Sequence, residues 1–143
     1  MYSFLKSVDD KIEINISYVN KIENLFNVRF PKVLIDYYMR YNNVKINLCI
    51  FTINQNEYEV VKIIPLKSKS NSFENIKRME LKFQYIPIDF MPLARNRGGD
   101  YYYWDKNENV YLIYSDRIDS PVKICDSIEA FFYLLENGRE SLM

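Results

Sequence analysis

Residues 95–105 read Arg-Asn-Arg-Gly-Gly-Asp-Tyr-Tyr-Tyr-Trp-Asp, and this stretch decides the fold. Gly98 and Gly99 open a charged turn, and the aromatic run that follows them is typical of a β-strand. A phosphate-binding loop would need a helix start after the glycines, so the strand predicts a turn or bulge instead. Asp100 directly follows the glycines, where its side chain is expected to hydrogen-bond the turn's own backbone.

The aromatic run alternates across the two faces of the predicted strand. Two of the four residues from Tyr101 to Trp104 are therefore expected to pack inward, and two to stand on the outer face. The polar segment 105–109 predicts a hairpin turn to the next strand, and Pro121 precedes a last short strand. The strands predicted in this half of the chain are 90–95, 100–104, 110–114 and 122–125.

Two further apolar runs lie upstream, at 45–53 and 58–66. The polar residues between them predict a hairpin, and Pro65 marks the second run as ending or as a sheet edge. Segment 67–75 is a polar surface loop that leads into a short helix. This helix is expected to carry Ile76, Met79 and Phe83 on its apolar side.

Apolar residues at a spacing of three and four predict helices at both ends of the chain. Asn15 or Ser17 is expected to cap the first, which ends near Asn27, and Pro31 suits the first turn of the second. Asp126, with Glu129 three residues later, predicts a capping box for a final helix that stops at Gly138. The predicted fold is α+β: two N-terminal helices, a mainly antiparallel central sheet of about five to six strands, and a C-terminal helix packed on it.

Length and composition favour one compact unit. The chain has 143 residues, of which 48% are apolar and 16% aromatic, enough to bury a core without disulfides or metals. A single domain over residues 1–143 is expected. Cys49 and Cys125 each lie in an apolar run rather than in a spaced pair, which favours reduced core thiols over a zinc site.

The sequence contains no histidine, which excludes Ser-His and Cys-His nucleophile pairs and histidine zinc sites. Asp105, Asn107 and Asn109 imitate the first positions of a calcium loop, but Val110 stands where that loop needs glycine. A Ser-Lys or carboxylate-only enzyme remains formally open, although no motif for either is recognisable. The expectation is a protein that is not an enzyme and uses no cofactor.

Net charge argues against nucleic acid as the partner. Lys plus Arg and Asp plus Glu number 19 each, so the protein carries no general basic field. Acidic residues outnumber basic ones from Ser115 to the C-terminus, and basic residues outnumber acidic ones from Lys62 to Lys82. The sequence shows neither a signal peptide nor an apolar stretch of about 20 residues, so a cytoplasmic location without membrane contact is expected.

Three motifs, in this order along the chain, resemble those of the SUKH superfamily of Smi/Knr-type domains. The first is Phe30-Pro31 before a tyrosine-bearing helix, the second is the charged turn and aromatic strand, and the third is the helix that opens at Ser127. Asn43 stands where glycine is usual in this superfamily, and Phe30 where leucine is usual. The residues at the structural motif positions are Phe30, Pro31, Tyr37, Gly98, Gly99, Asp100 and Phe131.

This resemblance implies a function. Bacterial members of the superfamily are mostly immunity proteins, which bind the toxin domain of a polymorphic or contact-dependent toxin inside the cell that makes it. The expected partner is therefore a cognate toxin domain, with the adjacent gene as its candidate source, and the expected state is a monomer or weak dimer. The fungal Smi/Knr proteins imply the alternative, a regulatory or scaffold domain with a cellular partner.

A tight protein contact needs a desolvated centre and a charged rim that steers the partner. Tyrosine, tryptophan and arginine are enriched in such centres, so the aromatic run and its flanking arginines are the predicted anchor. The acids of the C-terminal region are the predicted rim against a basic, nuclease-like toxin. The predicted binding residues are Arg95, Arg97, Tyr102, Trp104, Asp116 and Asp119.

Overall fold

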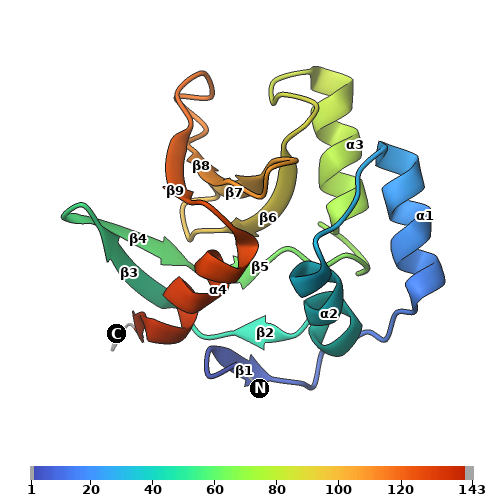
Figure 1. Cartoon of the computed structure of the whole chain (residues 1–143), viewed down its shortest axis with the longest axis horizontal. Helices are drawn as coiled ribbons and strands as arrows, with labels where there is room; N and C mark the ends of the chain where they lie inside the picture. The colour runs from blue at the N-terminus through green and yellow to red at the C-terminus, as the bar shows by residue number, and fades with distance from the viewer. Residues whose placement is uncertain (1, 141–143) are drawn as a thin grey trace.

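The computed structural model describes residues 2–140. Over this range the chain folds as an α+β unit of four helices and ten strands, which confirms the predicted class (Figure 1). The helices are α1 (Ile16–Phe26), α2 (Lys32–Tyr41), α3 (Phe73–Phe83) and α4 (Ile128–Asn137). The strands are β1 (Leu5–Ser7), β2 (Lys45–Ile46), β3 (Cys49–Ile53), β4 (Asn56–Val60), β5 (Lys62–Ile63), β6 (Met91–Arg95), β7 (Tyr101–Trp104), β8 (Val110–Ile113), β9 (Val122–Cys125) and β10 (Arg139–Glu140).

The largest sheet has the order β5-β6-β7-β8-β9, and every neighbouring pair in it is antiparallel. Two smaller sheets have the orders β10-β3-β4 and β1-β2. Figure 1 shows the β3–β4 hairpin on one side of the molecule and α1 with α3 on the other. No helix among the described residues is long and apolar enough to cross a membrane.

The two upstream apolar runs form the predicted hairpin but are each broken into two strands. Asn54 and Gln55 make the turn between β3 and β4, both with positive φ (51° and 71°). A two-residue turn of this handedness matches the twist of the strands it joins. The breaks separate β2 from β3 and β4 from β5, and this lets the two runs take part in three different sheets.

The helix ends agree with the sequence in part. Asn15 caps α1 by accepting the N–H of Tyr18, and Asn27 ends it in the left-handed conformation. Pro31 is the N-cap of α2 rather than a first-turn residue, one position earlier than predicted. The cap of α4 is Ser127, whose Oγ accepts the N–H of Ala130 at 3.0 Å, so the predicted Asp126 capping box is wrong. Asp126 instead pairs with Lys123 at 2.6 Å.

Gly138 ends α4, as predicted, for a reason that the sequence did not reveal. Its φ is −75°, so the backbone does not require glycine. A Cβ atom at this position would lie 2.6 Å from the carbonyl oxygen of Ile50. The close approach of the helix end to β3 is therefore what excludes a side chain here.

The predicted apolar side of α3 is mostly wrong. Ile76 is buried, but Met79 and Phe83 are 56% and 62% exposed. The helix instead buries Phe73 with two charged residues, Lys77 and Glu80. Apolar spacing could not find this face, because half of it is polar and neighbouring segments hydrogen-bond Lys77 and Glu80.

The sheet buries side chains on both of its faces. Tyr102 and Trp104 point to the main core, where Tyr102 lies against Phe131 (5.4 Å between ring centroids) and Trp104 against Phe30 (5.5 Å). Tyr103 points to the opposite face, which the segment after α3 covers with Ile86. The predicted alternation of the aromatic run across two faces is therefore confirmed, but the second face is not open to solvent, because it has a cover of its own and Tyr103 is buried under it.

Candidate functional site

The turn between β6 and β7 is organised by Asn96. Its Oδ1 accepts the backbone N–H of Asp100 at 2.9 Å, and its Nδ2 donates to Asp100 Oδ2 at 3.2 Å. Asp100 Oδ1 in turn accepts the N–H of Ser115 at 2.9 Å, at the end of β8. Asp100 thus ties two loops together, and Asn96, not Asp100, makes the side-chain bond to the turn's own backbone.

Only one of the two glycines in this turn has a backbone that requires glycine. Gly99 has a φ of +87°, whereas Gly98 does not fall in the positive range. A Cβ on Gly98 would meet its nearest neighbours at 3.5 Å, which is ordinary contact. The turn predicted from the Gly98-Gly99 pair is confirmed.

Gly99→Ala should lower the free energy of unfolding by about 1–2 kcal/mol, because an alanine side chain is strained at this φ. Gly98→Ala is the matched control and should change stability by less than about 0.5 kcal/mol. Urea unfolding of the two variants measures the difference. Equal losses in both would show that the conformation of Gly99 does not matter to the fold.

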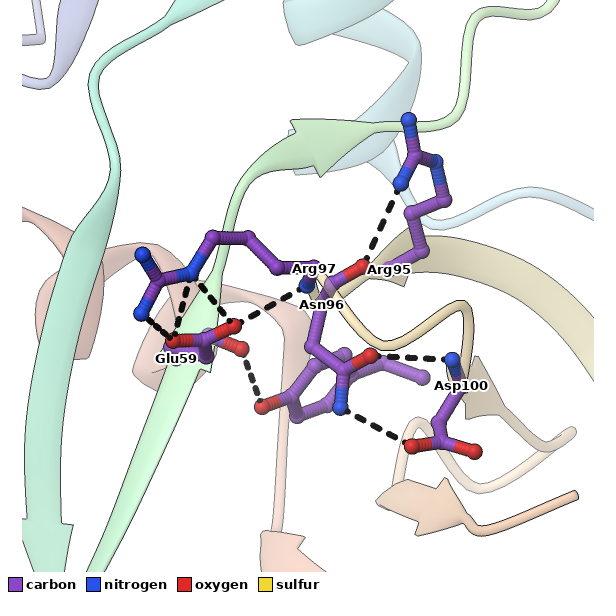
Figure 2. A network of polar contacts seen from close by, with 6 residues as sticks. Glu59, Arg95, Asn96, Arg97 and Asp100 are labelled. Carbon is purple, nitrogen blue, oxygen red and sulfur yellow. Dashed lines mark hydrogen bonds and ion pairs between the residues drawn. The ribbon is translucent and has the colours of Figure 1, made fainter.

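Arg97 and Glu59 connect the turn to the neighbouring sheet (Figure 2). The guanidinium of Arg97 donates from Nη2 to Glu59 Oε2 at 2.8 Å and from Nε to both carboxylate oxygens at 3.1 Å. The backbone N–H of Arg97 also donates to Glu59 Oε1, and the hydroxyl of Tyr102 donates to the Glu59 carbonyl at 2.7 Å. The side-chain hydrogen bonds between Arg97 and Glu59 lower the pKa of Glu59 and raise that of Arg97. Arg97 is therefore engaged within the fold.

Arg95 points away from this network, as Figure 2 shows, and its guanidinium donates to the carbonyl of Asn96 at 3.2 Å. It lines a pocket of ≈ 500 Å³ between β1, β2 and β5. We call this pocket the basic groove. Its charged lining residues are Lys6, Asp10, Lys45, Lys62 and Arg95, and the others are Asn43, Val44, Ile46, Val61 and Ile63.

Two of the predicted binding residues are not available at the surface. Tyr102 is 0% exposed and Trp104 is 1% exposed, so the prediction of an aromatic surface anchor is wrong. The physical reason is that α4 and the segment before α2 pack Phe131 and Phe30 against them. Both residues belong to the core that holds the turn in place.

Asp116 and Asp119 lie exposed in the loop between β8 and β9. Asp116 faces Arg117 at 3.8 Å, and the guanidinium of Arg117 lies over the ring of Tyr114. The bond from Ser115 to Asp100 places this loop beside the β6–β7 turn. A role of the two acids as a binding rim stays a prediction.

The calcium-like triplet forms the hairpin turn that the sequence favoured. Asp105 Oδ1 accepts the N–H groups of Asn107 and Asn109 at 3.0 and 2.9 Å, and Glu108 adopts a φ of 65°. Among residues 2–140, no three His, Cys, Asp or Glu side chains are grouped so that they could hold a metal ion.

The residues at the structural motif positions outside the β6–β7 turn lie in the core or at the start of a helix. Phe30, Tyr37 and Phe131 are buried in the main core, and Pro31 begins α2. Asn43, which stands in place of the usual glycine, has a φ of 68°. This explains both residues at that position, because glycine adopts positive φ freely and asparagine tolerates it.

Sequence reasoning missed Lys6, Lys45 and Lys62, which share the basic groove with Arg95. Lys45 and Lys62 each stand between two apolar residues, in the segments Val44-Lys45-Ile46 and Val61-Lys62-Ile63. A single basic residue in such a segment was the signal that could have found them. Only the three-dimensional structure, in which β2 lies against β5, shows that the two segments face one pocket.

Fold and site together define a small α+β domain. Its two distinctive features are the β6–β7 turn, which hydrogen bonds and an ion pair hold in place, and the basic groove beside it. The sequence model of the SMI1 / KNR4 family (SUKH-1) matches residues 13–134, most of the chain. The chain therefore belongs to this family, as its motifs suggested. No curated protein matches the chain.

Proposed function

We propose that this protein is an immunity protein, which binds a cognate toxin domain stoichiometrically and blocks it in the cytoplasm of the cell that makes the toxin. Membership of the SMI1 / KNR4 family (SUKH-1) over residues 13–134 carries the proposal, because the resemblance implies this role for bacterial members. The chemistry of the chain supports it. A protein without histidine and with a groove lined by Lys6, Lys45, Lys62 and Arg95 is suited to binding by surface contact.

The buried charged groups support binding over catalysis. Lys77 Nζ donates to the carbonyls of Ile88 and Phe90 at 2.6 and 2.7 Å, and Tyr103 donates its hydroxyl hydrogen bond to Glu80 at 2.5 Å. Both groups are 1% exposed, so a substrate would not reach them without an opening of the fold. Their contacts are those of structural residues.

Co-expression tests the proposal. The C-terminal domain encoded by the adjacent gene should stop growth when it is produced alone, and growth should return when this chain is produced with it. The two proteins should then co-purify in a 1:1 complex, measured by size-exclusion chromatography with light scattering.

The control is Gly138→Trp, whose side chain would collide with the carbonyl of Ile50 and should prevent correct folding, so that rescue is lost. A toxic domain that still kills in the presence of the folded protein would contradict the proposal. A harmless neighbour, together with recovery of a housekeeping complex in a pull-down, would favour the regulatory scaffold instead.

A further inference from the structure

We propose that the basic groove binds an acidic, extended segment of the protein partner, with Lys62 and Arg95 as its central carboxylate-binding residues. The inference deepens the proposed function, since it states the chemistry of the surface on the partner that this protein recognises. It concerns a part of the molecule other than the aromatic run and the acids Asp116 and Asp119.

The groove lies between outer strands of two sheets. β5 is an edge strand of the five-stranded sheet, and within residues 2–140 β2 pairs with β1 alone. Lys62 pairs with Arg95 across the β5–β6 ladder, so these two cations lie side by side. Lys6 on β1 and Lys45 on β2 supply the cations of the other wall. A pocket of ≈ 500 Å³ has room for several side chains of an extended segment.

Charge is unbalanced in the groove. Asp10 is the one acid among its lining residues, and Lys45 already pairs with it at 3.1 Å. Lys62 is half-buried, and its pKa is lowered first by burial and then by the positive charge of Arg95. Two like charges held together with partial loss of water are unfavourable, and the attraction of a carboxylate placed between them would offset their repulsion.

Arg95 and Arg97 differ in whether their guanidinium groups already bind a carboxylate. Glu59 binds Arg97 through both of its carboxylate oxygens, whereas Arg95 donates only to a backbone carbonyl at 3.2 Å. An arginine that holds a carbonyl with one nitrogen retains donors for a bidentate carboxylate. The turn thus uses one arginine for the fold and leaves the other for a ligand.

The lining favours a carboxylate-bearing peptide over phosphate. Basic and apolar residues alternate in two lining segments, Val44-Lys45-Ile46 and Val61-Lys62-Ile63. Phosphate sites are typically built from backbone N–H groups at glycine-rich turns or helix N-termini, and none of the described lining residues of this groove is a glycine or begins a helix. A neutral protein also lacks the general basic field that nucleic-acid binding needs.

Peptide binding tests the inference on the purified protein alone. A hexaglutamate peptide with an uncharged dye should bind at low salt, as measured by fluorescence anisotropy, and a hexaglutamine peptide should not. Lys62→Gln combined with Arg95→Gln should weaken hexaglutamate binding by about tenfold or more, since both carboxylate partners are lost. Lys62→Arg keeps the charge and should keep binding within about threefold.

The matched control is Lys69→Gln combined with Lys106→Gln, which removes the same charge from two exposed lysines outside the groove. It should change binding by less than about twofold. Equal weakening by both double variants, or no binding of hexaglutamate, would overturn the inference. Tighter binding of a hexathymidylate through the same residues would also overturn it, in favour of a phosphate ligand.

The outcomes separate this inference from the proposed function. If co-expression rescues growth and hexaglutamate does not bind, the groove is not the contact, and the immunity role stands. If hexaglutamate binds at Lys62 and Arg95 but the toxic domain is not neutralised, the groove is a genuine acidic-segment site of a protein with another role.

Discussion

Replacing Asn42 with alanine should lower the free energy of unfolding by about 3 kcal/mol, because one buried side chain holds three separate segments together. Asn42 is 0% exposed. Its Nδ2 donates to the carbonyls of Ile12 and Lys67 at 3.0 and 2.9 Å, and its Oδ1 accepts the N–H groups of Leu66 and Lys67 at 2.8 and 3.2 Å. Alanine would leave these buried and partly buried backbone groups without this partner. Urea unfolding followed by circular dichroism measures the loss.

The neighbouring residue provides the control. Asn43→Gly removes one hydrogen bond, from Nδ2 to the carbonyl of Asp10 at 2.8 Å, but relieves the positive φ of 68°. These two effects oppose each other, so stability should change by less than about 0.5 kcal/mol. A loss below about 1 kcal/mol in Asn42→Ala would contradict the view that Asn42 fixes the end of α2 against the rest of the fold.

Glu80→Gln should remove a pH dependence of stability that lies between about pH 4.5 and about pH 7. Burial raises the pKa of Glu80 from its ordinary value of 4.5 to about 7, against the opposing effects of the Tyr103 hydrogen bond and the charge of Lys77. Oε1 of this carboxyl is buried and has no hydrogen-bond partner among the described residues. A charge on this group is therefore poorly solvated, and the protonated form is the one that the folded state favours.

The sign of the effect follows from the two pKa values. Because the folded protein holds the proton more tightly than the unfolded chain, its stability falls as the pH rises from about 4.5 through about 7. The wild type should lose about 3 kcal/mol relative to Glu80→Gln between pH 4.5 and pH 8. Thermal or urea unfolding of both proteins across this range gives the difference between their free energies of unfolding. Titrating groups that both proteins share contribute equally and cancel in this difference.

Glu74→Gln on the same helix is the control for this experiment. Glu74 pairs with Arg78 at 2.8 Å and lies near the surface. The stability of Glu74→Gln relative to the wild type should therefore not rise with pH as that of Glu80→Gln does. A wild type that gains stability relative to Glu80→Gln as the pH rises would show that Glu80 is a carboxylate in the folded protein and that its burial is compensated.

The sequence predicted most elements of this fold because apolar spacing and turn residues agree along much of the chain. The strand 122–125 and the ends of α1 lie where they were expected, and the hairpin at Asn54 follows from its turn residues. The face of α3 could not be predicted, because Lys77 and Glu80 are buried by partners that are distant in the sequence. Local patterns carry no information about a carbonyl supplied by Ile88 or a hydroxyl supplied by Tyr103.

The candidate site was predicted less well, for a related reason. The alternation of the aromatic run placed Tyr102 and Trp104 on one face of β7 but did not reveal that both faces are covered. The two arginines look equivalent in the sequence, and only the position of Glu59 on β4 separates the paired Arg97 from the open Arg95. Lys62 belongs to the site because it pairs with Arg95 across β5 and β6, and the sequence does not reveal this pairing.

The most direct test of the account is a titration of the toxic activity of the neighbouring gene's C-terminal domain with this purified protein. Stoichiometric blocking through surface contact predicts that activity falls in proportion to the protein added and ends at one molecule per toxin domain. Full inactivation by a small fraction of an equivalent would show that this protein acts as a catalyst. Activity that persists in excess protein would show that the toxin domain is not its partner.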